Sequence, residues 1–328
     1  MAILVTGGAG YIGSHMVLAL RDRSEQVVVI DNLVTGAPWV LPPDVTLRGG
    51  DVGDQRFVES VIRDHDITEI AHFAAKIVVP ESVSDPLGYY RNNTVRTRNL
   101  IESAVRCGVE RFIFSSTAAV YGDVSGEPVG EDVILNPVSP YGRSKLMSEW
   151  MLEDAAKAHP MKYVALRYFN VAGADPLGRS GQSFPNATHL IKVAVQTALG
   201  QRPHMDIYGT DYPTRDGSCI RDYIHVTDLA NAHVDALAYL RNGGENAVFN
   251  CGYGQGFSVL EVVEVVRKVT GVNFKTNIGP RRPGDPATIV ARSDKIRRVL
   301  GWKPEHDDLK EIVGAAFSWE RKLKSRNA

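Results

Sequence analysis

The sequence predicts an α/β fold, in which a doubly wound parallel Rossmann sheet is followed by a smaller α+β C-terminal substrate domain. Three observations predict it. Short β-branched runs alternate with amphipathic stretches in the first half, a glycine-rich stretch links the first run to the first amphipathic stretch, and the alternation ends near residue 170. Such alternation is typical of a parallel sheet with helices on both faces. A chain of 328 residues is long enough for two domains.

The expected strands of the first half are short and apolar, and a continuous run such as VVVI fits a sheet that is buried on both faces. They lie at 2–6, 27–30, 45–49, 68–74, 111–116 and 162–169. Amphipathic patterns predict helices at 11–22, 54–64, 92–107 and 141–158. Residues 1–170, with a further segment near 217–242, are therefore expected to form the sheet domain.

The second half begins with two stretches that are rich in Gly, Pro, Asp and Ser and are expected to be loops, at 170–182 and 208–223. Helical patterns then return at 188–200, 227–241, 258–270 and 307–323. Residues 171–216 and 243–328 are expected to form the substrate domain.

The bulk composition excludes several classes of protein. A net charge of −1 gives no general attraction to nucleic acid or to an anionic membrane. The three cysteines, Cys107, Cys219 and Cys251, form no CxxC pair, which argues against a disulfide framework or a metal site and for a reducing, cytoplasmic environment. Since there is no basic leader and no apolar run of about 18 residues, we expect neither secretion nor a membrane span.

A dinucleotide site is indicated by VTGGAGYIGSH, which follows the first strand and opens the first helix. Gly8, Gly10 and Gly13 fit GxGxxG, while Gly7, Gly10 and Gly13 fit the related GxxGxxG. Glycines allow the tight turn and bring the backbone close to a pyrophosphate, which the helix N-terminus then binds. The motif is weak alone, but here it has a strand before it and a helix after it.

The end of the second strand indicates which dinucleotide is bound. Asp31 can accept hydrogen bonds from ribose hydroxyls and would repel a 2′-phosphate, and DNL supplies no adjacent basic residue. NAD is therefore expected rather than NADP. Asp51, after the third strand, is placed where it could reach the adenine.

A candidate proton-transfer site combines the hydroxyl run of FIFSSTAAVYG with PYGRSK about twenty residues later. On a helix, Tyr141 and Lys145 share one face. A free tyrosine has a pKa of about 10, and a nearby ammonium together with a positive nicotinamide ring would lower it. A Ser or Thr hydroxyl across the pocket could then connect the substrate to the phenolate. Such a pair alone is more often structural, but the glycine-rich stretch favours the catalytic interpretation.

TGGxGxxG, the Ser/Thr run and YxxxK together resemble the extended short-chain dehydrogenase/reductase family. ESVSDPLGYYRNN, LRYFNVAGA, DYPTRDGSCIRDYIHVTDLA and LGWKP resemble its UDP-glucose 4-epimerases, over nearly the whole chain. The resemblance implies that Tyr141 is the catalytic base, Thr117 the bridging hydroxyl and Lys145 the group that holds the nicotinamide ribose. It also implies a homodimer that packs through residues 92–107 and 141–158.

With the residue-based expectations, the resemblance implies a set of NAD contacts along the carboxyl edge of the sheet. They are Gly7, Gly10, Tyr11, Ile12, Gly13, Asp31, Asn32, Asp51, Val52, Phe73, Ala74, Ala75, Asn92, Ser115, Tyr141, Lys145 and Tyr168. Lys76 lies one position away from a lysine found near the cofactor phosphates in some members of the family, and its role stays open.

The resemblance implies a UDP-sugar as substrate. Arg221 and Arg282 match the residues that grip the pyrophosphate, a task that suits the guanidinium fork. The other expected substrate contacts are Asn170 near the diphosphate, Tyr208 on the uracil, Asp285 on the uridine ribose, Thr117 on the sugar and His189, which loosely matches an Asn on the uracil side.

The expected reaction interconverts UDP-glucose and UDP-galactose through a 4-keto intermediate. UDP-N-acetylhexosamines and UDP-xylose/arabinose remain open, the former because the residue near Ile289 matches one whose size governs their entry. A dehydratase or decarboxylase would need an acid where Ala118 and Ala119 stand. A non-catalytic NAD sensor is expected to lose Tyr141 or Lys145.

Overall fold

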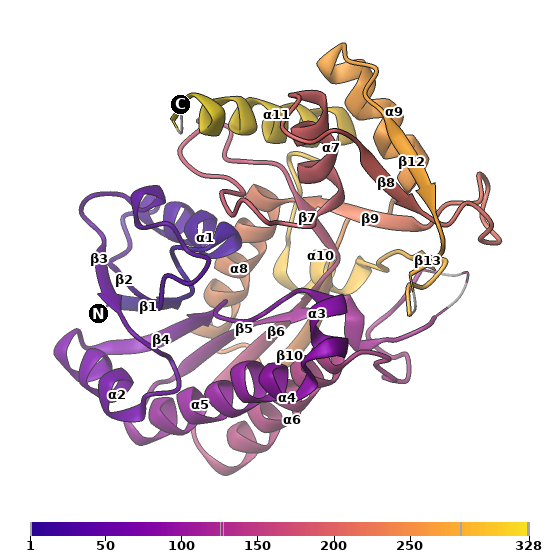
Figure 1. Ribbon diagram of the computed structural model, residues 1–328. Helices are drawn as coiled ribbons and strands as arrows, with labels where there is room; N and C mark the ends of the chain where they lie inside the picture. Colours follow the sequence, from indigo (N-terminus) through magenta and orange to yellow (C-terminus); the bar gives the residue numbers. More distant parts are fainter. Residues whose placement is uncertain (1, 125, 127, 283, 327–328) are drawn as a thin grey trace.

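The structure, a computed structural model, describes residues 2–124, 126, 128–282 and 284–326 (Figure 1). Within this part, a parallel sheet of seven strands has the order β10-β6-β5-β4-β1-β2-β3. The strands are β1 (Ala2–Thr6), β2 (Val27–Asp31), β3 (Thr46–Gly49), β4 (Ile67–His72), β5 (Arg111–Thr117), β6 (Lys162–Tyr168) and β10 (Ala247–Cys251). The chain reverses its winding between β1 and β4, as a doubly wound sheet does.

Helices cover both faces of this sheet. α1 (Tyr11–Arg21) and α8 (Val226–Arg241) pack together on one face, while α2 (Gln55–Asp64), α5 (Arg96–Arg106) and α6 (Pro140–Ala158) line the other. Both faces are therefore apolar: alternate residues of β2 enter two different cores, with Val27 and Val29 in one and Val28 and Ile30 in the other. This explains the unbroken VVVI run.

The strand at the β6 edge of the sheet was missed by the sequence analysis. β10 comes from the second half of the chain and pairs with β6 in parallel, with Phe249 opposite Leu166. β10 has only five residues, and it is not part of the regular alternation of strands and helices that marks the earlier strands. The sequence analysis placed residues 247–251 in the substrate domain, within 243–328, but they belong to the large parallel sheet. The rest of the predicted division into domains stays a prediction.

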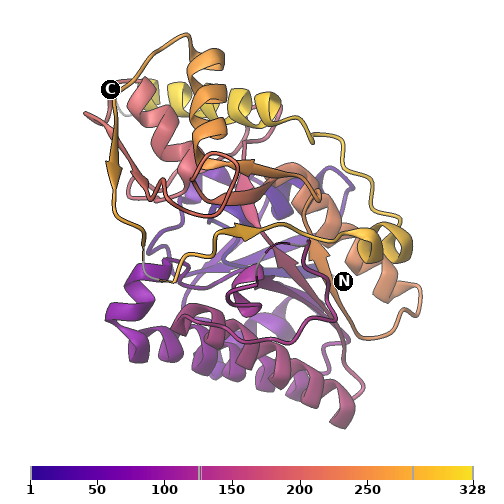
Figure 2. The ribbon, with the colours of Figure 1, turned by 90° about the vertical axis from the view of Figure 1, so that its right-hand side faces the viewer.

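The rest of the chain assembles over one end of the sheet (Figure 2). The two stretches expected to be loops, 170–182 and 208–223, also contain strands: the first contains β7 (Asn170–Ala172) and the second contains most of β9 (Ile220–His225). In the described residues β7 (Asn170–Ala172), β9 (Ile220–His225), β11 (Gly256–Ser258) and β13 (Thr288–Ile289) form a mixed sheet, and β8 (Met205–Tyr208) pairs with β12 (Thr276–Gly279). α7 (Leu190–Ala198), α9 (Val259–Thr270) and α11 (Leu309–Arg326) pack against one another.

The remaining short elements connect these parts. They are η1 (Pro38–Val40), α3 (Val79–Ser84), α4 (Pro86–Tyr89), the π-helix η2 (Tyr90–Val95), η3 (Ala118–Val120) and α10 (Asp294–Leu300). Of the helices in the described ranges, none has the length and apolar character needed to cross a membrane.

Candidate active site

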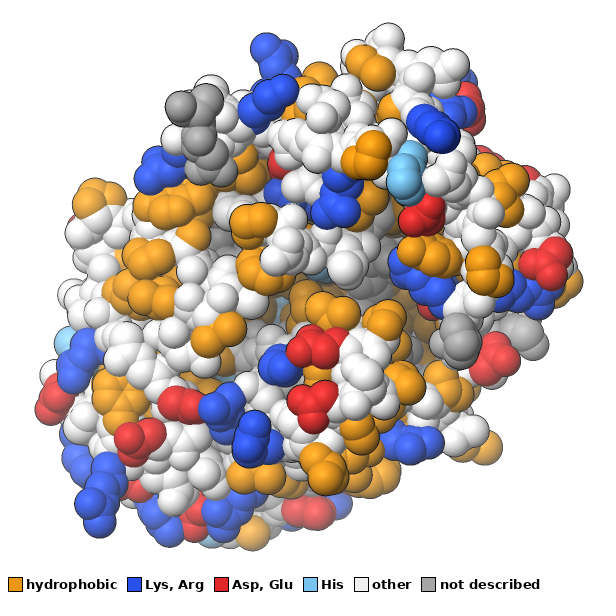
Figure 3. Space-filling view, in the orientation of Figure 1, with side chains coloured by type: hydrophobic (Ala, Val, Ile, Leu, Met, Phe, Trp, Pro, Cys, Tyr) orange, Lys and Arg blue, Asp and Glu red, His pale blue; other side chains and the backbone are white. Residues whose placement is uncertain are grey.

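The candidate site lies where the carboxyl ends of the parallel strands face the smaller assembly of β7–β9 and α7. The surface is hollowed between these two parts of the molecule (Figure 3). In open parallel sheets this edge, near the reversal of the winding, is where ligands bind. Most of the residues predicted from sequence come from the segments that follow β1, β2, β4, β5 and β6.

The glycine-rich stretch forms a tight turn between β1 and α1. Gly7 has φ +71°, and its carbonyl accepts a hydrogen bond from the Gly10 N–H at 3.1 Å. A Cβ on Gly13 would lie 2.1 Å from that same carbonyl oxygen, so a side chain is excluded there. Among the described residues no side chain caps α1 at Gly10, and its first turn has no acidic residue. The free N–H groups of that turn suit an anion.

Asp31 lies at the end of β2 beside this turn. Its carboxylate accepts hydrogen bonds from the Ala9 N–H at 3.0 Å and the Leu33 N–H at 2.8 Å. Burial raises the pKa of Asp31, while these two hydrogen bonds oppose the rise. The carboxylate is thus held at the edge of the turn, where the prediction puts the adenosine ribose. Asn32 follows it, exposed.

The segment after β4 packs against the glycine turn. The Phe73 N–H donates to the Thr6 carbonyl at 2.9 Å, and a Cβ on Gly7 would lie 2.7 Å from the Ala74 nitrogen. Phe73, Ala74 and Ala75 therefore border the predicted cofactor site together with Tyr11 and Gly13.

Asp51 and Asn92 share one partner. Asp51 forms an ion pair with Arg96 at 2.6 Å, and Arg96 also donates to the side-chain oxygen of Asn92. Val52 is buried next to them. The structure brings these predicted residues together, on the β3 and α5 side of the site.

Asn93 is a residue that the sequence analysis missed. It is buried, accepts from the Lys76 N–H at 2.9 Å, and donates to the Lys76 carbonyl at 2.9 Å and to Ser144 Oγ at 3.1 Å. It lies in the π-helix η2, and π-helical turns are frequent at functional sites. Asn93 thereby fixes the segment after β4 to α6. The signal was present in the adjacent pair of asparagines, of which only Asn92 was selected.

The residues predicted to transfer a proton lie together at the ends of β5 and α6. Pro140 opens α6, and Ser139 caps it by accepting from the Gly142 N–H at 3.1 Å. Tyr141 is 8% exposed and Lys145 is 3% exposed. Thr117, at the end of β5, lies close enough to Tyr141 to lower the pKa of its phenol. Lys145 Nζ donates to the Ser115 carbonyl at 2.7 Å and lies 4.8 Å above the Phe114 ring.

Burial has the largest effect on the pKa values of Tyr141 and Lys145. It raises the pKa of Tyr141, with the Thr117 hydrogen bond opposing the rise. It lowers the pKa of Lys145 to about 7, with the Glu149 charge opposing the fall. Burial therefore works against ionisation of Tyr141, and a positive charge at the site would favour the phenolate. A bound nicotinamide ring would supply it.

Tyr168 and Ser115 lie behind this pair. Their hydroxyls are hydrogen-bonded to each other, and burial raises the pKa of Tyr168 far above its ordinary value. The pair links the side chains of β5 and β6, and both residues stay predicted cofactor contacts.

Four of the predicted substrate residues meet as two pairs. The Arg282 guanidinium lies 3.8 Å from the centre of the Tyr208 ring, and Arg221 lies 3.7 Å from Asp285. Arg221 is on β9, which pairs with β7 and so lies beside Asn170. Two cations and one exposed aromatic ring are thus gathered at one end of the site, as a nucleoside diphosphate requires.

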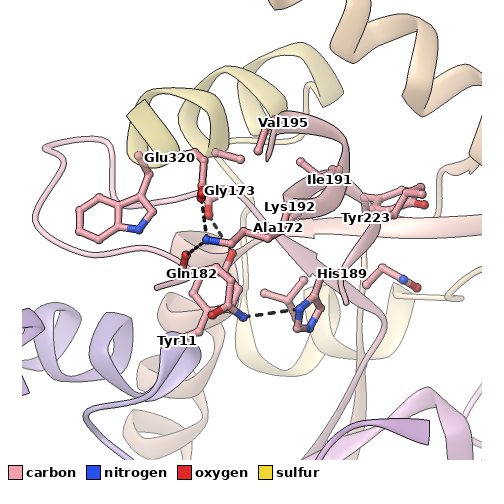
Figure 4. A pocket seen from close by; sticks show the side chains of 15 residues that line it. Tyr11, Ala172, Gly173, Gln182, His189, Ile191, Lys192, Val195, Tyr223 and Glu320 are labelled. Atoms are coloured by element: carbon pink, nitrogen blue, oxygen red, sulfur yellow. Dashed lines mark hydrogen bonds and ion pairs between the residues drawn. The ribbon is translucent and has the colours of Figure 1, made fainter. Parts of the chain in front are cut away.

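Two more of the predicted substrate residues, Asn170 and His189, line a pocket that Tyr11 also lines (Figure 4). The Tyr11 hydroxyl donates to the Gly173 carbonyl at 2.8 Å and so connects α1 to the strand that carries Asn170. Burial, with the Lys192 charge, lowers the pKa of His189 to about 4, so His189 is neutral at physiological pH.

The start of α7 was also missed. His189 precedes the helix without forming a side-chain cap in the described structure, and the first turn has no acidic residue. Its N–H groups, like those of α1, can receive an anion next to Asn170. The sequence analysis expected a helix at 188–200, but it did not consider the first turn of that helix as an anion-binding site.

The comparisons with known proteins agree with this geometry. Residues 3–252 match the model of the NAD dependent epimerase/dehydratase family. The UDP-glucose 4-epimerase of Azospirillum brasilense is 54% identical over 98% of this chain and 92% of its own.

Two solved structures share the fold over almost their full length. The UDP-glucose 4-epimerase of Bifidobacterium longum, in complex with NAD⁺ and UDP, has a TM-score of 0.93 at 36% identity and covers 98% of both chains. The UDP-Glc/GlcNAc 4-epimerase of Campylobacter jejuni has a TM-score of 0.85 at 47% identity over 98% of this chain and 99% of its own. The glycine turn, the Tyr141–Lys145 pair and these matches together place the chain in the NAD-dependent epimerase/dehydratase family.

Proposed function

We propose that the protein is a UDP-sugar 4-epimerase that interconverts UDP-glucose and UDP-galactose and carries NAD as a bound cofactor. The observation that carries the proposal is the position of Tyr141 beside the Thr117 hydroxyl, with Lys145 one helical turn away, at the edge of the sheet that also carries the glycine turn. The 54% identical relative from Azospirillum brasilense supports the choice of substrate.

NAD fits the residues that are present. The pyrophosphate would lie on the first turn of α1, where the absent Cβ of Gly13 lets the Gly7 backbone pack directly against the helix. Asp31 would bind the adenosine ribose, Asp51 and Val52 the adenine, and Tyr141 with Lys145 the nicotinamide ribose. The remaining predicted contacts, Ile12, Phe73, Ala74, Ala75, Asn92, Ser115 and Tyr168, border the same edge of the sheet.

The protein's own groups would handle the proton and the orientation of the sugar. NAD, when bound, would supply reversible hydride transfer at C4 of the sugar, with the hydride returning to the opposite face. Tyr141 removes the proton from the C4 hydroxyl, and the Thr117 hydroxyl holds that oxygen against the phenol. The Lys145 ammonium stabilises the phenolate. The resulting 4-keto sugar has to present both faces in turn, so the protein must grip the nucleotide more firmly than the hexose.

The nucleotide would be gripped at the far end of the site. Arg221 and Arg282 would bind the diphosphate, with Asn170 and the first turn of α7 beside them. Tyr208 would stack on the uracil, Asp285 would bind the uridine ribose, and the neutral His189 would donate or accept a single hydrogen bond. Arg282 lies 3.8 Å from the centre of the Tyr208 ring, so the uracil would stack on the other face of the ring or replace the guanidinium.

The direct test is to incubate the purified protein with UDP-galactose, without added NAD, and to separate the products by chromatography. We expect UDP-glucose to form until the two sugars reach equilibrium. No conversion, even after NAD is added, would contradict the proposed function.

A second substrate is favoured by one comparison. The Campylobacter jejuni relative, 47% identical, is named for both UDP-Glc and UDP-GlcNAc. The same assay with UDP-N-acetylglucosamine and with UDP-xylose would define the substrate range. A dehydratase remains disfavoured because Ala118 and Ala119 carry no proton donor.

We further propose a homodimer that packs through η2–α5 and α6. α6 presents Trp150, 54% exposed, and Met147, and η2 presents Val95, also exposed. Exposed apolar side chains on adjacent helices are typical of an interface. Trp150→Asp is expected to convert the dimer to a monomer in light scattering after size exclusion, whereas Ile278→Asp, at an exposed position on β12, should leave it dimeric. A monomeric parent protein would contradict the proposal.

A cytoplasmic location is also proposed. The three cysteines are free thiols in the structure, and two of them are buried, as suits a reducing compartment.

A further inference from the structure

The three residues at the end of β5 each hold a different turn of α6. Thr117 lies beside the Tyr141 phenol, and the Ser115 carbonyl accepts from Lys145 Nζ at 2.7 Å. Ser116 Oγ, between them, donates to the carboxylate of Glu149. Tyr141, Lys145 and Glu149 are spaced by four residues, so they lie on one face of α6 and point to the same strand. Two of these contacts belong to the proposed chemistry, and the third has no assigned purpose.

Glu149 is a buried charge with an unusually complete set of partners. It is 5% exposed, and Arg167 on β6 binds it through both carboxylate oxygens, with Nε at 3.0 Å from Oε1 and a terminal nitrogen at 2.6 Å from Oε2. Arg167 is opposite Ser116 in the register of β5 and β6. It also donates to the Tyr121 hydroxyl at 3.1 Å, which in turn donates to Asn250 at 2.6 Å. The carboxylate is therefore fixed in position from two strands.

The charges around Lys145 show what this carboxylate does. His72 on β4 is the titratable group that faces Lys145 from that strand, and burial and the lysine charge keep it neutral by lowering its pKa to about 3. β6 contributes the neutral phenol of Tyr168 and the cation of Arg167. From α6 come Tyr141 and Glu149, so Glu149 is the one anion of this set, and its charge opposes the loss of the Lys145 proton that burial favours.

We propose that Glu149, held by Arg167 and Ser116, is a positioning residue that keeps Lys145 charged beside Tyr141. The inference rests on the proposed function, since it is in that reaction that the lysine charge matters. Without the carboxylate, Lys145 and Arg167 would be two buried cations with no counter-ion among the groups just named. Lys145 would then lose its proton at a lower pH, and Tyr141 would lose the charge that stabilises its phenolate.

The test compares two variants that break the same ion pair from opposite sides. Removing the anion, in Glu149→Gln, should move the alkaline limb of the kcat pH profile to lower pH by about one unit, which is about a tenfold loss on that limb. Removing the cation, in Arg167→Gln, leaves the carboxylate and should move the limb to higher pH. Both variants should lose stability, because each leaves a buried charge unpaired.

A control separates structural damage from the effect on Lys145. Glu69 is equally buried and is bound by Arg241 at 2.6 Å, but it lies on β4 at the opposite end of the sheet. Glu69→Gln should lower the thermal midpoint without moving the pH profile. A shift in the same direction in Glu149→Gln and Arg167→Gln, or an equal shift in Glu69→Gln, would overturn the proposal.

A second readout needs no substrate. The ultraviolet absorbance of tyrosinate, taken as the difference between each protein and its Tyr141→Phe counterpart, reports the ionisation of Tyr141 in the NAD-loaded enzyme. In Glu149→Gln this signal should appear at higher pH than in the parent. An unchanged signal would overturn the role of Glu149 even if the protein proved to act on another sugar, whereas a shifted signal without epimerisation would contradict only the proposed function. If Glu149→Gln does not fold, the opposite shift in Arg167→Gln decides the question.

Discussion

Replacing Tyr141 with Phe is expected to lower kcat for UDP-galactose by about 10²–10⁴-fold, the usual contribution of a positioned acid–base group. The substitution removes only the hydroxyl, so the ring stays packed in the site, and Lys145 keeps its bond to the Ser115 carbonyl at 2.7 Å. The amount of NAD that co-purifies should therefore stay close to that of the parent protein. Initial rates and the absorbance of released cofactor measure the two quantities.

The matched control is Tyr163→Phe. Tyr163 is also a buried phenol, but it lies near the start of β6, at the other end of the sheet from Thr117. It should retain the activity of the parent. If Tyr141→Phe kept most of the activity, another group would have to be the base.

Replacing Gly13 with Ala is expected to abolish NAD retention. The new Cβ would lie 2.1 Å from the Gly7 carbonyl oxygen and 2.8 Å from its carbon, and both atoms belong to the backbone of the turn. The turn can relieve this contact only by opening, which moves the N–H groups that the pyrophosphate needs. We expect the protein to purify without cofactor, with its unfolding free energy lowered by about 1–3 kcal/mol.

The control for added volume is Gly314→Ala on α11. A Cβ there meets no described atom within 4 Å, and Ala favours a helix more than Gly does. Its NAD content should be unchanged and its thermal midpoint equal or higher. Full NAD content in Gly13→Ala would mean that the cofactor does not bind on the first turn of α1.

The first half of the fold could be predicted because its signals are local. Most of its strands are buried and largely apolar, the exception being β3 with the sequence TLRG, and its main helices have an amphipathic pattern or a starting signal such as Ser139–Pro140. The glycine turn and the Tyr141–Lys145 pair are likewise defined within a few residues. These features need no knowledge of which strands become neighbours.

The features that were missed depend on distant pairing. β10 is a strand because it adds to β6, some eighty residues earlier, with Phe249 opposite Leu166. The roles of Asn93 and Glu149 follow from contacts to Lys76, Ser144, Ser116 and Arg167, which a single sequence does not place next to them. The sequence marked the hydroxyl run before Ala118, but only the register of β5 and β6 shows that Ser116 and Thr117 serve different turns of α6.

The central claim is that Tyr141 and Lys145 act beside a cofactor that takes up and returns the hydrogen of the sugar's C4. The most direct measurement uses UDP-galactose that carries deuterium at C4, in ordinary water, with the product examined by NMR. We predict UDP-glucose that retains the deuterium at C4, at a rate that Tyr141→Phe lowers in parallel with kcat. Product with hydrogen from the solvent at C4 would contradict the account, because the hydride would then not have been held between the two half-reactions.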